Sequence, residues 1–247
     1  MKIFLSAIET NKDVVSTLIK NVKMKYNLMS FFYVKNNFEL SCRIRDNSKE
    51  VLIDSGAHSF QKGKKVDWIE YTRQYAEFIK NFDKPNVVGY FEMDVDNIIG
   101  YDKVLELRKI LESVSNKIIP VWHKNRGIED YKQMCKNYAG KVIAITGFKN
   151  EDIRDDQYLI FLKYAKKYNC KVHCLGMTRK KVLDKVPFDY VDSSSWKQDA
   201  IYGRIDKRKV SKSFSKTNII DIMVECYKAY MKMQDYYYKK WQKVCKD

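Results

Sequence analysis

Short runs of β-forming residues alternate along this chain with amphipathic helical stretches, and this alternation constrains the fold more than any other feature. Such βα units build a parallel sheet with helical crossovers. Eight strands are predicted: Lys2–Ala7, Met29–Val34, Val51–Ser55, Val87–Met93, Lys117–Trp122, Val142–Thr146, Lys171–Gly176 and Asp189–Asp192. Helical periodicity predicts Lys12–Tyr26, Trp68–Phe82, Tyr101–Val114, Ile128–Tyr138, Asp152–Tyr168 and Arg179–Lys185, and it is weakest over Lys35–Glu50.

Eight strands and their helices in 247 residues predict a (β/α)8 barrel, with a doubly wound open sheet as the structural alternative. We expect the barrel core over residues 1–195. Residues 196–247 would add a basic loop, Trp196–Ser215, and a long helix, Lys216–Asp247, that pack on the barrel or complete it within a single domain. No apolar run approaches the roughly 20 residues of a membrane span, so we expect a cytoplasmic protein without a membrane partner.

The chain is strongly basic, with 47 Lys and Arg against 31 Asp and Glu, a net charge of +16. Such an excess attracts polyanions, including nucleic acids. Segment 196–247 holds 13 Lys and Arg against 6 Asp and Glu, interleaved with Tyr and Trp, a mixture that suits phosphates and stacked bases. The alternative is a last barrel helix whose aromatic side chains pack on the core. The phosphate-binding candidates are Lys197, Arg204, Lys207, Arg208 and Lys209.

Three predicted strands end in a carboxylate: Asp54, Asp94 and Asp192. Helix capping accounts for an isolated aspartate at a strand end. It does not account for three of them at the one mouth where barrel strands end and barrel enzymes work. Two histidines, His58 and His123, also follow predicted strands, and either could be a general base or a structural residue.

The metal-ligating residue types form no strong pattern. The six cysteines are scattered, which is typical of free thiols in a cytoplasmic chain. Cys170 and Cys174 flank His173 but lack a second ligand pair. Asp94 and Asp96, two residues apart at a strand end and so on one face, could hold Mg²⁺. We nevertheless expect neither a resident metal nor a cofactor.

The strand-end segments resemble, in order along the chain, the motifs of tRNA-guanine transglycosylases and their DNA-modifying phage and bacterial relatives. Asp54-Ser55-Gly56 with Phe60 resembles the Asp-Ser-Gly-Gly-Phe/Tyr-Gln signature. Four later segments resemble the family's Phe-Asp element, its Gly-Gly-Leu loop, its Leu-Met-Gly strand end and the strand end with the nucleophilic aspartate. They are Met93-Asp94, Ile145-Thr146-Gly147-Phe148, His173-Cys174-Leu175-Gly176 and Tyr190-Val191-Asp192-Ser193. The resemblance covers about residues 50–205.

The chain also departs from the family. Ala57 and His58 stand where the signature has its second Gly and an aromatic residue, and Trp122-His123-Lys124 replaces Gln-Gly-Gly. The Cys-x-Cys-x-x-Cys…His zinc module of the tRNA enzymes is absent, because the cysteines after the nucleophile position are Cys226 and Cys245. That module helps the tRNA enzymes engage RNA, so its absence favours the DNA-modifying branch.

The resemblance implies a glycosyltransferase that exchanges guanine in DNA for a free 7-deazaguanine base of the preQ0 or preQ1 type. Asp192 would hold the sugar covalently, Asp54 would manage protons, and Asp94 would bind the guanine edge. Backbone amides at 146–148 would meet the O6 atom, and the flipped-out base would stack between His58 and Leu175. The full set of base-binding candidates is Asp94, His58, His123, Thr146, Gly147, Phe148, Leu175 and Gly176.

Three other functions fit parts of the sequence. One is a transglycosylase that acts on tRNA without the zinc module, and another is a silent nucleic-acid-binding accessory subunit. The third is a Mg²⁺-dependent phosphodiesterase built on Asp94, Asp96 and His123. Assays with tRNA, assays with DNA and sensitivity to chelators distinguish these functions from one another.

Overall fold

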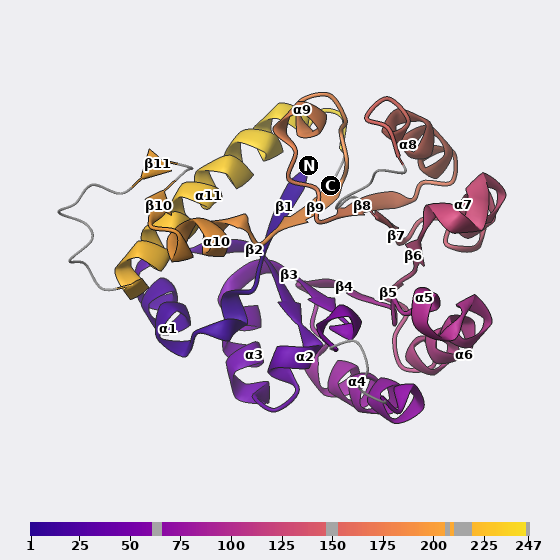
Figure 1. The fold of residues 1–247 in the computed structure, drawn as a ribbon, viewed down its shortest axis with the longest axis horizontal. Helices are drawn as coiled ribbons and strands as arrows, with labels where there is room; N and C mark the ends of the chain where they lie inside the picture. Colours follow the sequence, from indigo (N-terminus) through magenta and orange to yellow (C-terminus); the bar gives the residue numbers. More distant parts are fainter. Residues whose placement is uncertain (61–65, 147–152, 206–207, 210–218, 246–247) are drawn as a thin grey trace.

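The computed structural model describes residues 1–60, 66–146, 153–205, 208–209 and 219–245 (Figure 1). Among these residues nine strands form one sheet, in the order β5-β4-β3-β2-β1-β9-β8-β7-β6. The strands are β1 (Lys2–Ser6), β2 (Met24–Ser30), β3 (Ser48–Asp54), β4 (Val87–Phe91), β5 (Ile118–Ile119), β6 (Val121–Trp122), β7 (Val142–Thr146), β8 (Lys171–Leu175) and β9 (Tyr190–Ser193). All their pairings are parallel.

The sheet closes into a barrel through one interrupted strand. The two ends of the sheet order, β5 and β6, are separated in the chain by Pro120 alone, so residues 118–122 belong to both edges. Ile118 and Ile119 pair with β4, and Val121 and Trp122 pair with β7. Proline has no N–H to give to a ladder, which is why the strand divides there. The prediction of a (β/α)8 barrel is confirmed.

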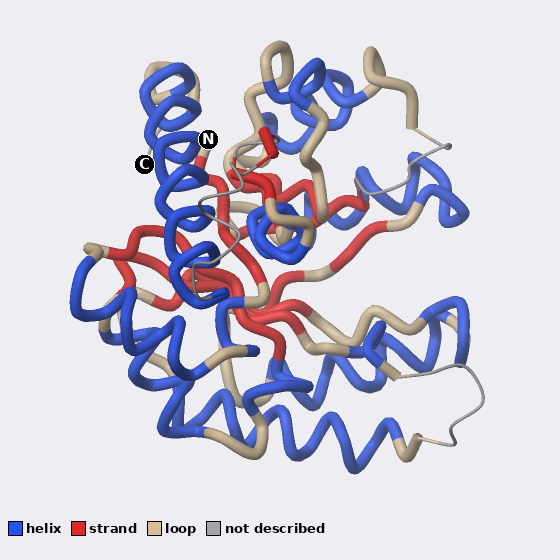
Figure 2. The backbone as a smooth tube through the Cα atoms, turned by 60° about the vertical axis from the view of Figure 1, so that its left-hand side comes forward, coloured by secondary structure: helices blue, strands red, loops and turns tan. Residues whose placement is uncertain are grey.

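Helices surround the strands, as Figure 2 shows with helices in blue and strands in red. They are α1 (Lys12–Asn21), α2 (Phe31–Val34), α3 (Phe38–Asp46), α4 (Trp68–Phe82), α5 (Asp96–Ile99), α6 (Tyr101–Glu112), α7 (Gly127–Asn137), α8 (Tyr158–Lys167), α9 (Lys180–Leu183), α10 (Ser195–Ile201) and α11 (Ile219–Trp241). No helix within the described ranges is both long and apolar enough to cross a membrane.

Helix α4 illustrates how the sequence dictates a barrel helix. Asp67 caps it by accepting hydrogen bonds from the N–H groups of Ile69 and Glu70. Its apolar residues recur at helical spacing and bury one face, which includes Tyr75, Ile79 and Phe82. Each such side chain stabilises the fold by about 1.5–3 kcal/mol. The bounds predicted from the sequence, Trp68–Phe82, are those of the structure.

The chain between residues 22 and 50 differs from the prediction. The strand is β2, Met24–Ser30, whereas Met29–Val34 was expected. Residues 31–34 are helical, because β2 must stay in register with β3, Met24 opposite Ser48 and Ser30 opposite Asp54. The stretch expected to be least helical contains α3, capped by the Asn37 side chain.

Two apolar layers fill the molecule. The larger lies between the strands and the helices, and the smaller lines the barrel interior with alternate residues of each strand. The interior cluster consists of Phe4, Tyr26, Leu28, Leu52, Phe91, Ile119, Val121, Ala144 and Tyr190. The interior is therefore packed with side chains, and a candidate site is sought at the mouth where the strands end.

The C-terminal segment supplies the last barrel helices. Trp196–Ser215 was expected to be loop-like, but α10 begins it, and a short hairpin of β10 (Arg204–Ile205) and β11 (Arg208–Lys209) follows. The Gln234 side chain of α11 donates to the carbonyl oxygens of Ile3 and Tyr26, at 2.8 and 2.9 Å. The Tyr227 hydroxyl donates to Asn27 at 2.7 Å. Helix α11 is thus docked on the first two strands through buried polar groups.

Candidate active site

The carboxyl ends of the strands bring several polar side chains to one mouth. Asp54 is the last residue of β3, Asp94 follows β4, and His123 follows β6. Asp192 lies near the end of β9, where Phe4 of β1 is its register partner. The negative charges of Asp94 and Asp192 both raise the pKa of Asp54, so the three carboxyl groups share one electrostatic environment.

Asp54 sits in a tight turn. Its carboxylate accepts a hydrogen bond from the Gly56 N–H at 2.9 Å. Gly56 has φ +74°, and a Cβ there would lie 2.4 Å from the Cβ of Phe32. Only glycine fits such a position without strain. Burial raises the pKa of Asp54 to about 6, so this carboxyl can give or take a proton close to neutral pH.

Two histidines hold Asp94 from opposite sides. The Nε2 atom of His58 lies 3.0 Å from Oδ2, and the Nε2 atom of His123 lies 2.5 Å from Oδ1. Burial alone would raise the pKa of Asp94, but these bonds hold it well below its usual value. The hydrogen bond to Asp94 raises the pKa of His58, and in His123 it more than offsets the lowering by burial. Asp94 is therefore an ionised carboxylate that favours the protonated form of both rings.

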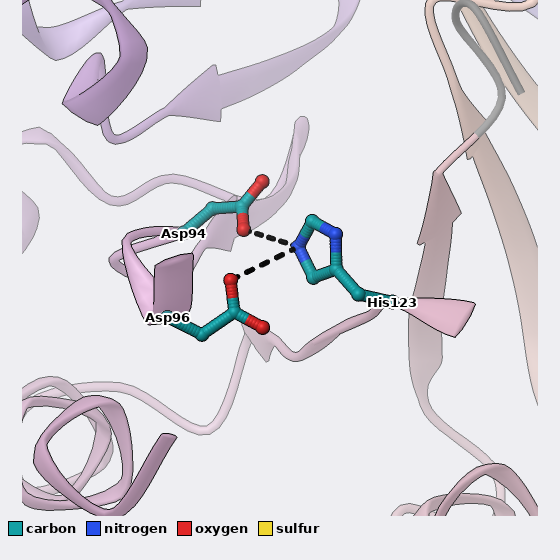
Figure 3. Close-up of side chains that lie close together, drawn as sticks. All are labelled: Asp94, Asp96 and His123. Carbon is teal, nitrogen blue, oxygen red and sulfur yellow. Dashed lines mark hydrogen bonds and ion pairs between the residues drawn. The ribbon is translucent and has the colours of Figure 1, made fainter. Parts of the chain in front are cut away.

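Asp96 completes a cluster with Asp94 and His123 that Figure 3 shows in close-up. It does not extend the strand, as the two-residue spacing suggested, but begins α5. Its Oδ1 atom is 3.8 Å from Nε2 of His123, and its buried Oδ2 atom has no hydrogen-bond partner among the described residues. One ligand atom from each of the three residues lies within 4.8 Å of the others, so the cluster has the composition of a cation site.

The separation between Asp94 and His123 argues for a hydrogen bond in this cluster. Two neighbouring ligands that each lie about 2.1 Å from Mg²⁺ in octahedral geometry are about 3.0 Å apart. The 2.5 Å between Asp94 and His123 is shorter than that. His123 would have to move away from Asp94 before both could bind one ion.

Asp192 is oriented by two donors. Its Oδ1 atom accepts from the Gly176 N–H at 2.8 Å and lies 2.9 Å from Nε2 of His173. His173 is fully buried inside the barrel, where its ring contacts those of Phe4 and Phe91. The Asp192 side chain keeps 15% exposure at the mouth. A fixed carboxylate with partial access is suited to act as a nucleophile.

A buried ion pair ties the β4 end to the interrupted strand. The guanidinium of Arg108 on α6 donates to both carboxylate oxygens of Glu92, at 2.5 and 3.1 Å. Glu92 also accepts a hydrogen bond from the Val121 N–H at 2.5 Å. Its carboxylate thus gives this N–H an acceptor beside the break in the strand at Pro120. Glu92 is two residues before Asp94, and Val121 is two residues before His123. The pair therefore joins the two segments that carry those residues.

The sequence did not single out Glu9 as a site residue. It lies in the 3₁₀ turn Ile8–Thr10 after β1 and is 6% exposed. Its Oε1 atom accepts from the Ser30 N–H at 3.0 Å. Burial raises the pKa of Glu9 to about 7. Its position as the first acid after the first strand could have indicated a place at the mouth.

Of the other residues predicted to bind the base or the phosphates, some lie within the described part of the chain and some outside it. Thr146, Leu175 and Gly176 stand at the ends of β7 and β8, on the same mouth. Gly147, Phe148 and Lys207 lie outside the described residues, as do the side chains of Arg208 and Lys209. Lys197 donates to the Thr10 hydroxyl at 2.7 Å, which places it on the rim. Arg204 is 3.3 Å from the Asp199 carboxylate and lies over the Tyr202 ring.

The cysteines behave as the sequence predicted. Cys42, Cys135, Cys170, Cys174 and Cys226 have free thiols, and the last four of these are buried. Cys174 packs in the core between strands and helices, whereas His173 beside it contacts Asp192. The two side chains therefore point to opposite faces of β8 and do not form a common site.

The fold and these strand ends define a (β/α)8 barrel with an acidic mouth. No family model matches the chain, and no curated protein matches it. Among solved structures, orotidine 5'-phosphate decarboxylase from Thermotoga maritima is similar, with a TM-score of 0.43 and 13% identity over 78% of this chain and 88% of that chain. A likeness at that TM-score bears on neither the activity nor the ligands of this chain.

Proposed function

We propose that the protein is a guanine transglycosylase that exchanges guanine in DNA for a free 7-deazaguanine base. One observation carries the proposal: three carboxyl groups at one mouth differ in their hydrogen-bond partners and in their access. Asp54 titrates near neutral pH, Asp94 is ionised between two histidines, and Asp192 is fixed by Gly176 and His173. Carboxyl groups whose environments separate their pKa values typically have separate acid, base and nucleophile roles.

The exchange consists of two displacements at one carbon. The Asp192 carboxylate attacks C1′ of the deoxyribose, and the bond from C1′ to guanine N9 breaks as the covalent bond forms. The departing guanine takes the proton of Asp54. The incoming base returns a proton to Asp54, its nitrogen attacks C1′, and the bond to Asp192 breaks. Atoms and protons balance over the cycle, with no cofactor.

Asp94 is the residue proposed to bind the base. An ionised carboxylate is a strong acceptor for the N1–H and the amino group of guanine. His58 now occupies one of its oxygens, but the His58 side chain is 74% exposed, so it can leave when a base arrives. His123 remains beside Asp94 as a donor for the O6 atom. A base inside a duplex cannot reach this mouth, so it must be flipped out.

The decisive experiment uses labelled guanine and duplex DNA. Wild type is expected to exchange the label, whereas Asp192→Ala and Asp192→Asn are expected to lose exchange and the trapped covalent adduct while retaining the fold. Exchange by Asp192→Ala would overturn the nucleophile assignment. Parallel assays with tRNA distinguish the tRNA-acting alternative, and DNA binding by wild type without any exchange would indicate an accessory subunit.

The cluster of Asp94, Asp96 and His123 favours a second candidate, a metal-dependent phosphodiesterase. Carboxylate and imidazole ligands suit a divalent cation, which would activate water for attack on a phosphodiester. Asp96→Asn separates the two functions, because Asp96 has no role in base exchange. The phosphodiesterase would lose activity in this variant and in wild type treated with a chelator, whereas the transglycosylase would be unaffected by either.

A further inference from the structure

Glu9 is a buried carboxyl group that the two displacements do not use. The chain turns into the 3₁₀ segment at Ala7, which has φ +69°, and the Glu9 side chain is thereby placed against the end of β2. One oxygen accepts from the Ser30 N–H. The other, Oε2, is buried and has no hydrogen-bond partner among the described residues. Leaving a buried acceptor unpaired is costly unless it carries a proton or serves a function.

Ser30 connects Glu9 to Asp54. The two residues are register partners at the ends of β2 and β3. The Ser30 hydroxyl is buried without a partner among the described residues, and it would lie 2.7 Å from a Cβ on Gly56, the residue whose N–H binds Asp54. Glu9, Ser30 and the Asp54 turn are therefore contiguous polar groups at the mouth.

The charged groups that face Glu9 come from two elements. Lys197 of α10, held on Thr10, lowers the pKa of Glu9, and the Asp54 carboxylate of β3 raises it. Burial is the largest effect and brings the pKa of Glu9 to about 7 and that of Asp54 to about 6. Two neighbouring carboxyl groups that both resist ionisation titrate as a pair.

We propose that Glu9 is a positioning residue that stays protonated beside Asp54, so that the pair carries at most one negative charge while Asp54 exchanges its proton with the bases. The inference rests on the proposed transglycosylase function. When Glu9 loses its proton, its negative charge raises the pKa of Asp54, which then holds its proton more tightly and is a poorer donor to the departing guanine. Base exchange then slows at alkaline pH.

The test compares pH profiles of base exchange for wild type and Glu9→Gln. Glutamine keeps an acceptor for the Ser30 N–H but cannot ionise. Both proteins should lose rate above about pH 6 as Asp54 ionises, but above about pH 7 the fall of log rate with pH should steepen in wild type, towards a slope of about 2, and should keep a slope of about 1 in Glu9→Gln. Identical profiles would overturn the inference. Glu9→Ala, which also removes the bond to Ser30, reports the purely structural effect as a loss at every pH.

A second measurement separates this inference from the proposed function. Carboxyl carbons labelled with ¹³C report the titration of Glu9 by NMR whether or not the protein exchanges bases. Wild type should show a glutamate that titrates near 7 and is missing in Glu9→Gln, and Asp54→Asn should shift that titration to lower pH. A midpoint unaffected by Asp54→Asn would refute the coupling even if base exchange occurs, and a shifted midpoint would support it even if exchange is absent.

Discussion

The Nε2 atom of His123 lies 2.5 Å from Oδ1 of Asp94, although the two residues follow different strands, β6 and β4. This bond holds the ionised carboxylate at the mouth. It also links the segment after β4 to the end of the interrupted strand.

Removing the donor should destabilise the protein in a pH-dependent manner. The pKa of His123 is raised above its ordinary 6.5, so its contribution is complete below that value and is lost as the pH rises through the folded pKa. The lowered pKa of Asp94 makes its own contribution disappear in acid, below its ordinary 3.8. His123→Leu should therefore lower the free energy of unfolding by about 2 kcal/mol near pH 6 and by less near pH 9. Urea denaturation at both pH values measures this.

Glutamine is the matched control at this position, because its amide can donate to Asp94 without a charge. His123→Gln should lose less stability than His123→Leu near pH 6, and its loss should vary less with pH. Equal losses for the two variants at both pH values would show that the hydrogen bond to Asp94 contributes nothing.

Breaking the Arg108–Glu92 pair should be more damaging. Arg108→Met leaves a carboxylate that is 1% exposed without its partner, which typically costs about 3–5 kcal/mol. The double variant Arg108→Met/Glu92→Gln should recover part of this loss, because it removes the buried charge and keeps an acceptor for the Val121 N–H. Chemical denaturation of the two variants provides the comparison, and a double variant less stable than the single one would contradict the explanation.

Gly56→Ala should lower the free energy of unfolding through backbone strain and through a steric clash. Gly140, which has the same backbone conformation without close neighbours, separates the two contributions. Both Gly56 (φ +74°) and Gly140 (φ +76°) have left-handed backbone, but a Cβ on Gly140 meets nothing within 4 Å, whereas one on Gly56 meets Phe32 at 2.4 Å. We expect Gly140→Ala to cost about 1–2 kcal/mol from backbone strain and Gly56→Ala to cost at least about 1 kcal/mol more. Thermal unfolding curves test this, and equal costs would exclude the steric contribution.

Lys197 on the rim should contribute to DNA affinity through phosphates. Lys197→Ala should weaken binding of unrelated duplexes alike and reduce the slope of log affinity against log salt by about 1. Lys80, near the end of α4 at the other end of the barrel, is the matched control, and Lys80→Ala should leave the slope unchanged. Fluorescence anisotropy over a salt series measures both, and equal slopes for the two variants would remove Lys197 from the DNA-binding surface.

The sequence predicted best those elements whose burial follows a simple period. Val142–Thr146 and Trp68–Phe82 have the bounds expected, because an uninterrupted apolar strand and a one-sided helix are stable for local reasons. The prediction was wrong over residues 22–34, because the apolar residues there suit either a strand or a helix. The register between β2 and β3 determines which residues form the strand. The predicted strand ends placed Asp54, Asp94 and Asp192 at one mouth. They did not indicate which groups form hydrogen bonds with these three carboxylates.

The partners depend on contacts that no local pattern encodes. His58 meets Asp94 across 36 positions of the chain, and Glu9 meets Ser30 across 21. The aromatic residues of the C-terminal helix could be assigned to a core or to nucleic acid from the sequence, and the structure buries Tyr227, Tyr230 and Tyr237. Their burial leaves the proposed DNA contacts to the segment before that helix.

The interruption at Pro120 makes the barrel unequal around its circumference. On either side of that proline two residues pair with the neighbouring strand, whereas β2 and β3 pair over six positions. Local opening should therefore start at this seam, and amide hydrogens of residues 118–122 should exchange with solvent faster than those of β2. Because His123 directly follows the seam, a brief parting of the barrel wall would widen the mouth beside Asp94, where the proposed function requires a flipped base to enter.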